Sequence, residues 1–320
     1  MTHLRWGALA VLLGFALGCS SEPAPSNSTD AGPSDTGSVT DTGPVDAGPA
    51  DAGPSRCGSE TPDVSAIRRT EGLVVGRDGT LYYSQANAVG RLRPGMEPEA
   101  RWAVLPGSTG TVWGMVIDPS RSRLYVGSPS AGRIFAVTLE DTPTVTTYVP
   151  SAGQPNGLTL GPDGALYYSD FGGNQVYRVP PDGMRAAVTT SAIAQANGVA
   201  FGPDGNLYVC SYGAGTVLRL TLTDGAETAR AVAVRGVGSP DGIAFDSMGR
   251  MLITDNGMGR LLRADADGSN VMTLRSGISS AASLDFGVGA LRCSDLFIAS
   301  GGAMVRYEYD GMGATVPWQN

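Results

Sequence analysis

The sequence predicts an all-β protein: a six-bladed β-propeller, with four antiparallel strands in each blade, that follows a disordered linker. A short motif recurs six times at intervals of 41 to 44 residues. Each copy has a small-residue step, an apolar run, a turn rich in Gly and Asp, and a second β-rich run. Residues 57–320 also lack helical periodicity. A repeat of this length made of strands and turns is typical of propeller blades.

One position marks each copy of the motif. The six marker residues are Gly72, Gly114, Gly157, Gly198, Gly242 and Ser283. In the third copy, residues 158–160 and 166–168 are predicted to be antiparallel strands joined by the tight turn 161–164, where Pro presets φ and Gly supplies a positive φ. A third strand over residues 175–179 and an outer strand near residue 187 complete this blade.

The N-terminus resembles an export signal. Arg5 precedes the apolar stretch 8–17, which is too short to span a bilayer. Small residues then precede Cys19, as in a bacterial lipobox. We therefore expect a signal peptide over residues 1–18, lipidation of Cys19, and an exported bacterial lipoprotein tethered to the membrane or cell surface. Ordinary secretion is the alternative.

Residues 19–56 are of low complexity. Asp-Ala-Gly-Pro recurs at 30–33, 46–49 and 51–54. Such a composition cannot form a packed core, so this segment is predicted to be a disordered tether. Calcium binding by its Asp-x-Gly steps is the alternative, but no folded loop would bring these steps together.

The remaining cysteines predict how the ring closes. Export exposes the chain to an oxidising compartment, so a disulfide is expected. Cys57 opens the folded domain, residues 57–320, and Cys293 lies in the last repeat. The first and last segments of a ring meet, which predicts a Cys57–Cys293 bridge. Cys210 lies in an apolar run and is predicted to be a buried small residue.

Composition excludes several kinds of site. The net charge is −8, which argues against binding to nucleic acid. The only histidine, His3, lies in the predicted signal peptide. A mature chain without His cannot use a His general base or a His-ligated zinc. Catalysis would therefore depend on carboxylates, Tyr, Arg, Ser or a metal.

The residue before each marker suggests a metal site. Four of the six carry side-chain oxygen: Glu71, Asn156, Asn197 and Asp241. Radial repeats would bring these positions to one axis, whereas Trp113 and Ala282 would fill the other two positions. An all-oxygen set suits Ca²⁺ best, with Mg²⁺, Mn²⁺ and Zn²⁺ as alternatives. Each Asn-Gly or Asp-Gly step taken alone is more commonly a turn.

Within each blade a hairpin joins the first two strands, so the end of the second strand should lie beside the start of the first strand. This places Asp170, Ser211 and Asp255 near the same face as the candidate metal ligands. Asp170 is a candidate for contact with a substrate.

At these residues the chain resembles the gluconolactonase and regucalcin (senescence marker protein) family of calcium-dependent lactonase propellers. The resemblance covers residues 70–310 and rests on the Glu-Gly, Asn-Gly, Asn-Gly and Asp-Gly steps that begin at the four candidate ligands. It implies that Glu71, Asn197 and Asp241 bind the metal directly, that Asn156 lies on its open side, and that Asp241 is also the general base. Family members that bind sugar lactones have Arg where this chain has Gln154.

Two functions remain open on this evidence. The first is a surface-anchored, metal-dependent hydrolase of small lactones or related esters. The second is a non-catalytic propeller that serves as a scaffold for a protein or a glycan. In either case we expect a monomer.

Overall fold

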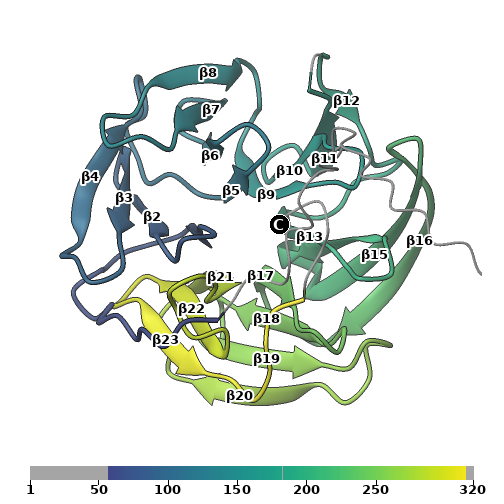
Figure 1. Cartoon of the computed structure of the whole chain (residues 1–320). Coiled ribbons are helices and arrows are strands. Elements are labelled where there is room, and N and C mark those ends of the chain that lie inside the picture. The colour runs from purple at the N-terminus through teal and green to yellow at the C-terminus, as the bar shows by residue number, and fades with distance from the viewer. Residues whose placement is uncertain (1–56, 182, 315–320) are drawn as a thin grey trace, which may run out of the picture. The chain divides into compact units, whose positions relative to one another are not determined.

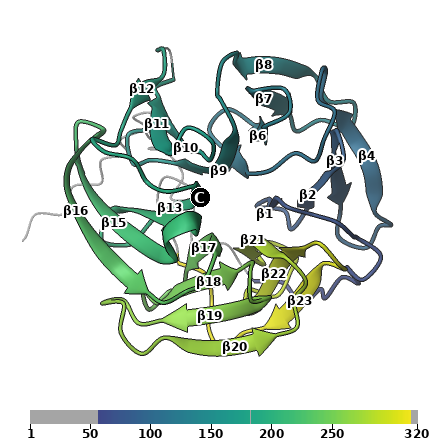
Figure 2. The same cartoon turned by 180° about the vertical axis from the view of Figure 1, so that it is seen from behind.

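The computed structural model describes residues 57–181 and 183–314. In this part of the chain, six antiparallel sheets are arranged radially around one axis (Figure 1), and the view from behind shows the same ring (Figure 2). Neighbouring strands within each sheet are consecutive in the sequence. The predicted six-bladed propeller is therefore confirmed.

Within each blade the strands follow one another in chain order from the axis outward. They are β1 (Leu73–Val75), β2 (Leu81–Gln85), β3 (Ala88–Leu92), β4 (Glu99–Val104), β5 (Met115–Asp118), β6 (Arg123–Ser128), β7 (Arg133–Thr138), β8 (Val145–Val149), β9 (Pro155–Leu160), β10 (Leu166–Asp170), β11 (Gln175–Val179), β12 (Ala186–Ala187), β13 (Ala196–Phe201), β14 (Leu207–Ser211), β15 (Thr216–Thr223), β16 (Ala226–Arg235), β17 (Pro240–Phe245), β18 (Met251–Asp255), β19 (Arg260–Ala264), β20 (Met272–Ser276), β21 (Ala281–Phe286), β22 (Asp295–Ser300) and β23 (Val305–Glu308). A 3₁₀ turn, η1 (Tyr212–Ala214), follows β14.

The third blade is built as its sequence predicts. Strand β9 pairs with β10 so that Leu160 faces Leu166 across the turn. The amide of Gly164 donates to the carbonyl of Gly161 (2.9 Å), and Gly164 has a φ of +68°, which glycine adopts without steric cost. The turn composition therefore fixes the pairing register of this hairpin.

The sixth blade differs from the predicted four strands. Its sheet contains β21, β22 and β23, and no fourth strand is present within the described residues. After β23 the chain crosses to the fifth blade, where Ala314 N donates to Phe245 O (2.8 Å) and Tyr309 Oη donates to Asp246 Oδ2 (2.7 Å). Residues 309–314 thus pack on the neighbouring blade instead of pairing with β23.

The first segment of the domain closes the ring against the last blade. Cys57 and Cys293 form the predicted disulfide, with their Cα atoms 5.3 Å apart. Further along, Thr70 N donates to Ser300 O (2.9 Å). Covalent and backbone links therefore hold the two ends of the ring together.

The core lies between adjacent blades. The tyrosines at positions 82, 83, 167 and 168 are all buried and pack in this core. Tyr167 meets Phe201 of the next blade edge to face, with ring centroids 5.0 Å apart. Such contacts join sheet to sheet around the ring.

Several predictions lie outside the described residues: the signal peptide over 1–18, lipidation of Cys19, and the linker over 19–56. Within the residues that the structure describes, no helix is long and apolar enough to cross a membrane.

Candidate active site

The four predicted oxygen-bearing residues occupy equivalent positions on the innermost strands. Glu71 lies two residues before β1, Asn156 lies on β9, Asn197 on β13 and Asp241 on β17. The last three are buried and Glu71 is half-buried. We call these four the axial residues. Trp113 and Ala282 hold the equivalent positions of the second and sixth blades.

Glycine after each axial residue lets adjacent inner strands touch. A Cβ atom built on Gly198 would overlap the carbonyl oxygen of Asp241, and one built on Gly157 would overlap that of Asn197. The same relationship joins Gly114 to Asn156. The repeated glycine is therefore what allows neighbouring axial residues to approach one another.

Hydroxyl groups from the second strands tie these contacts together. Ser169 Oγ accepts a hydrogen bond from Gly157 N (2.9 Å) and donates one to Asn197 O (2.6 Å). Thr254 Oγ1 does the same between Gly242 N (2.7 Å) and Ala282 O (2.6 Å). These backbone groups are satisfied by the fold, so the axial side chains are the groups that remain available for a ligand.

Asp241 and Glu71 are electrostatically linked. Burial raises the pKa of Asp241 well above its usual range, the charge of Glu71 raises it further, and side-chain hydrogen bonds with Asn197 and Asn256 oppose the rise. Burial also raises the pKa of Glu71, to about 7. Neither carboxylate forms an ion pair with an arginine in the described part of the chain.

The axial residues fit a hard divalent cation. Asn197 Oδ1 is buried and has no hydrogen-bond partner among the described residues. An unpartnered buried oxygen is costly, as is a desolvated carboxylate pair without a counter-charge. A cation would satisfy both. No group of three or more His, Cys, Asp or Glu side chains suited to a metal occurs in residues 57–181 and 183–314, because this set has only two carboxylates beside its amides.

Asp170 lies beside the axial residues and holds a loop. It pairs with Pro155 across β9 and β10, next to Asn156. Its Oδ1 atom accepts hydrogen bonds from Gln154 N (2.9 Å) and Gly173 N (3.0 Å). The carboxylate is thus committed to the backbone on both sides of the hairpin end.

Asp255 has the same role in the fifth blade. Its Oδ1 atom accepts from Ser239 N (3.1 Å) and Met258 N (3.2 Å), and its Oδ2 atom pairs with Arg260 (2.6 Å). In the fourth blade, Ser211 Oγ donates to Ala194 O (3.0 Å) instead. In the third and fifth blades, the last residue of the second strand thus anchors the loop that follows it, whereas in the fourth blade it holds the segment that precedes β13.

Three residues that the sequence interpretation missed follow these anchors. Phe171, Tyr212 and Asn256 each lie 15 positions after the axial residue of the same blade (156 to 171, 197 to 212, 241 to 256). We call them the rim residues. Each donates its backbone amide to the residue two positions before the axial residue of its blade, over distances of 3.0 to 3.2 Å. Their constant spacing from the axial residues was a signal that could have identified them.

The rim residues form a connected arc. Trp113 meets Phe171 edge to face with centroids 5.8 Å apart, and Phe171 meets Tyr212 in the same way at 5.8 Å. Tyr212 Oη lies 3.5 Å from Asn256 Oδ1, and the Asn256 side chain hydrogen-bonds with Asp241. The arc therefore runs from the second blade to the buried carboxylate of the fifth.

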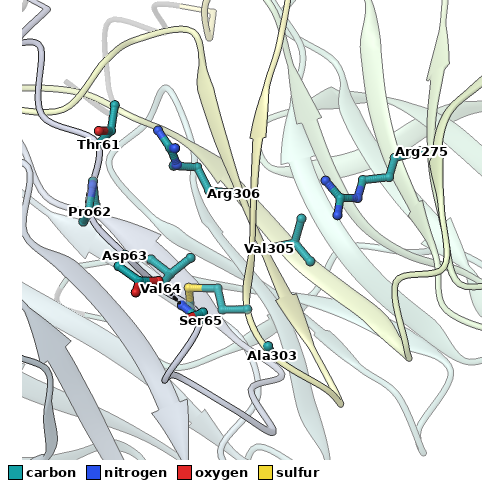
Figure 3. A pocket seen from close by; sticks show the side chains of 10 residues that line it. Thr61, Pro62, Asp63, Val64, Ser65, Arg275, Ala303, Val305 and Arg306 are labelled. Atoms are coloured by element: carbon teal, nitrogen blue, oxygen red, sulfur yellow. Dashed lines mark hydrogen bonds between the residues drawn. The ribbon is translucent and has the colours of Figure 1, made fainter.

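A pocket of about 460 Å³ lies away from the axis. Side chains of residues 61–65 and 303–306, together with Arg275, line it (Figure 3). It adjoins the outer strand of the sixth blade and includes neither axial nor rim residues. The candidate site therefore depends on the axial geometry and not on this pocket.

Solved structures share this fold. A putative gluconolactonase has 21% sequence identity and a TM-score of 0.66, with 79% of this chain and 92% of that chain covered. A gluconolactonase from Xanthomonas campestris has 22% identity and a TM-score of 0.62, with 75% and 86% covered. Regucalcin from Agrobacterium tumefaciens, described as a calcium-binding protein, has 18% identity and a TM-score of 0.64, with 83% and 97% covered.

No curated protein sequence matches the chain closely. The family described as the SMP-30/Gluconolactonase/LRE-like region matches residues 69–302, which include all four axial residues and all three rim residues. Because this match spans well over half of the chain, the protein belongs to the SMP-30/gluconolactonase/LRE-like family.

Proposed function

We propose that the chain is a metal-dependent hydrolase of lactones or related esters. Glu71, Asn197 and Asp241 would bind the cation, and Asn156 would lie on its open side. The observation that carries this proposal is the buried, unpartnered Asn197 Oδ1 atom beside two carboxylates that no arginine neutralises in the described residues. Family membership and the calcium-binding regucalcin neighbour favour Ca²⁺.

The chemistry is that of ester hydrolysis. A bound cation would supply a positive charge that polarises the carbonyl of the substrate. Asp241 takes a proton from water, whose oxygen forms a bond to the carbonyl carbon. The ring C–O bond of the lactone breaks, the proton passes to the ring oxygen, and a hydroxy acid results. Asn156 is placed to orient the water or the substrate.

Asp170 supports the site from behind. Because its Oδ1 atom already accepts two backbone amides, we assign it to positioning the loop that carries Phe171. Direct contact of Asp170 with a substrate, which the sequence suggested, stays a prediction.

We infer that the protein is exported and anchored to a membrane through lipid on Cys19. The support is the sequence: an apolar segment, small residues, and then Cys followed by a Gly/Pro/Asp-rich stretch. Mass spectrometry of the mature chain should give an N-terminal lipidated Cys19, and Cys19→Ala should release the protein from the membrane fraction. A mature chain that begins elsewhere and carries no lipid would refute the anchor.

A lactone panel tests the activity. The mature chain should hydrolyse one or more lactones with added Ca²⁺ and lose this activity in a chelator. Asp241→Asn should lower kcat/KM by about 100-fold or more. Asp267→Asn, which alters an exposed turn carboxylate, is the matched control and should retain activity. Calcium binding without turnover of any lactone would instead favour the scaffold function.

A further inference from the structure

We propose that the site takes lactones or esters that carry an aromatic group, bound against the arc formed by Trp113, Phe171 and Tyr212. This inference rests on the proposed hydrolase function and specifies its substrate class. The observation behind it is the pair of edge-to-face contacts, Trp113 with Phe171 and Phe171 with Tyr212, whose end at Tyr212 is linked to Asp241 through Asn256.

The rings are positioned by rigid elements. Phe171 directly follows β10 and its loop is held by Asp170. Tyr212 begins η1 directly after β14, and its amide donates to Gln195 O (3.2 Å). Trp113 occupies the axial position of the second blade, where its amide donates to Gly127 O (2.9 Å). Each ring thus has a backbone anchor, as a preorganised binding surface needs.

All three rings are half-buried. The large fully buried aromatic side chains, such as Tyr83, Tyr168 and Phe297, lie instead between the sheets. Rings that only pack the core would be covered in the same way. The partial exposure of the arc leaves apolar surface available at the end of the propeller where the axial residues lie.

The arc leads around the ring of blades toward Asp241. Trp113 lies in the second blade, Phe171 in the third and Tyr212 in the fourth, and Asn256 then connects the arc to Asp241 in the fifth. A planar group lying against the rings would therefore place an attached ester carbonyl toward the buried carboxylate. Edge-to-face aromatic contacts of this kind contribute a factor of about 2 to 10 in affinity.

A kinetic comparison isolates the aromatic group. Dihydrocoumarin and δ-valerolactone are both six-membered lactones, but only the first has a fused benzene ring. After each kcat/KM value is divided by the rate constant for hydroxide-catalysed hydrolysis, the wild-type chain with Ca²⁺ should prefer dihydrocoumarin by about 10-fold or more. Phe171→Leu and Tyr212→Leu should each lower this ratio about 3- to 10-fold. Tyr307→Leu on the outer strand β23 is the control and should leave it unchanged.

A binding measurement separates this inference from the hydrolase proposal. The Asp241→Asn chain, whose kcat/KM should be at least about 100-fold lower, is titrated with each lactone by calorimetry. Dihydrocoumarin should bind at least about 10-fold more tightly than δ-valerolactone, and Phe171→Leu in the same background should remove the difference. If the wild-type chain with Ca²⁺ hydrolyses neither lactone but this binding pattern holds, the hydrolase proposal fails and the aromatic site stands. If lactones are hydrolysed without preference for the aromatic one, the aromatic site is wrong.

Discussion

Asp241 and Glu71 form a carboxylate pair contributed by the fifth and first blades. Burial raises the pKa of Asp241 well above its usual range, and the charge of Glu71 raises it further. The pKa of Glu71 itself is raised to about 7 by burial. With both groups ionised and no bound cation, the folded state therefore carries an electrostatic cost at neutral pH that the unfolded chain does not.

The metal-free protein should lose stability as pH rises. A folded-state pKa above the unfolded value means that the folded state holds protons more tightly, so the contribution of Glu71 is fully present below pH 4.5 and is lost as pH rises through about 7. Thermal unfolding in a chelator should show a Tm that falls by several degrees between pH 5 and pH 8. Added Ca²⁺ should raise Tm more at pH 8 than at pH 5, because protons compete with the cation.

Asp241→Asn is the informative variant for this prediction. Removing one charge should flatten the pH dependence of Tm in the chelator and abolish most of the stabilisation by Ca²⁺. Asp267→Asn should change neither. A metal-free Tm that does not depend on pH, or an equal effect of Ca²⁺ on the Asp241→Asn chain, would contradict the assignment of this pair.

The glycine after Asn197 should tolerate no side chain. A Cβ atom at position 198 would overlap the backbone carbonyl of Asp241, which cannot rotate away. Gly198→Ala should therefore lower the free energy of unfolding by about 2 kcal/mol or more and should weaken Ca²⁺ binding. Gly110→Ala is the control: its nearest neighbour would be Ser130 Cβ at 3.7 Å, an ordinary contact, so stability should change by less than about 0.5 kcal/mol. Equal stability of the two variants would show that the inner strands can move apart.

The sequence was sufficient to predict the propeller and the axial positions. Turns such as 161–164 fix the local hairpins, and the 41- to 44-residue spacing repeats them around a ring. The bridge between Cys57 and Cys293 followed from ring closure and is present. These features depend on local turn chemistry and on the spacing of the repeat, both of which are present in the amino-acid sequence itself.

The remaining features depend on contacts between blades. The aromatic arc joins Trp113, Phe171 and Tyr212, which come from three different blades. Within the described residues the sixth blade has three strands, and Tyr309 attaches the segment after β23 to Asp246 of the fifth blade. The 15-residue spacing from the axial residues marks the positions of Phe171 and Tyr212, but it does not predict that their rings meet, and no repeat in the sequence marks the contact of Tyr309 with Asp246.

The thiol count of the protein should report the ring closure. In a Cys19→Ser chain, the native oxidised protein should show no reactive thiol, because Cys210 is fully buried and burial, together with the charge of Asp241, raises its pKa. Unfolding without a reductant should reveal one thiol, and unfolding with a reductant should reveal three. Two thiols or more in the unreduced, unfolded chain would argue against the bridge.

Removing that bridge should destabilise the ring. It links residues 236 positions apart, so it restricts the unfolded chain strongly. The double variant Cys57→Ser/Cys293→Ser should lose about 2–5 kcal/mol of unfolding free energy relative to the oxidised chain. The same variant under reducing conditions should match the reduced wild-type chain, which controls for effects of the substitutions themselves.

The hydroxyl of Tyr309 should contribute more to stability than that of Tyr208, although both donate to an Asp at a blade turn. Tyr309 Oη donates to Asp246 Oδ2 (2.7 Å), whose side chain is 0% exposed, whereas Tyr208 Oη donates to Asp204 Oδ2 (3.1 Å), whose side chain is 36% exposed. Burial alone would raise the pKa of Asp246, but hydrogen bonds from Tyr309, Arg250 and backbone amides outweigh it and lower the pKa below its usual value. The stabilisation is therefore present above pH 4 and is lost as pH falls through the lowered pKa.

Denaturant unfolding at pH 7 tests this comparison. Tyr309→Phe should cost about 1.5–3 kcal/mol, because it removes a donor from a buried charge, and Tyr208→Phe should cost about 1 kcal/mol or less, because water can replace the lost donor. At pH 3 the difference between the two variants should shrink as Asp246 approaches protonation. If the two variants cost the same at both values of pH, the link between residues 309–314 and the fifth blade does not depend on the Asp246 charge.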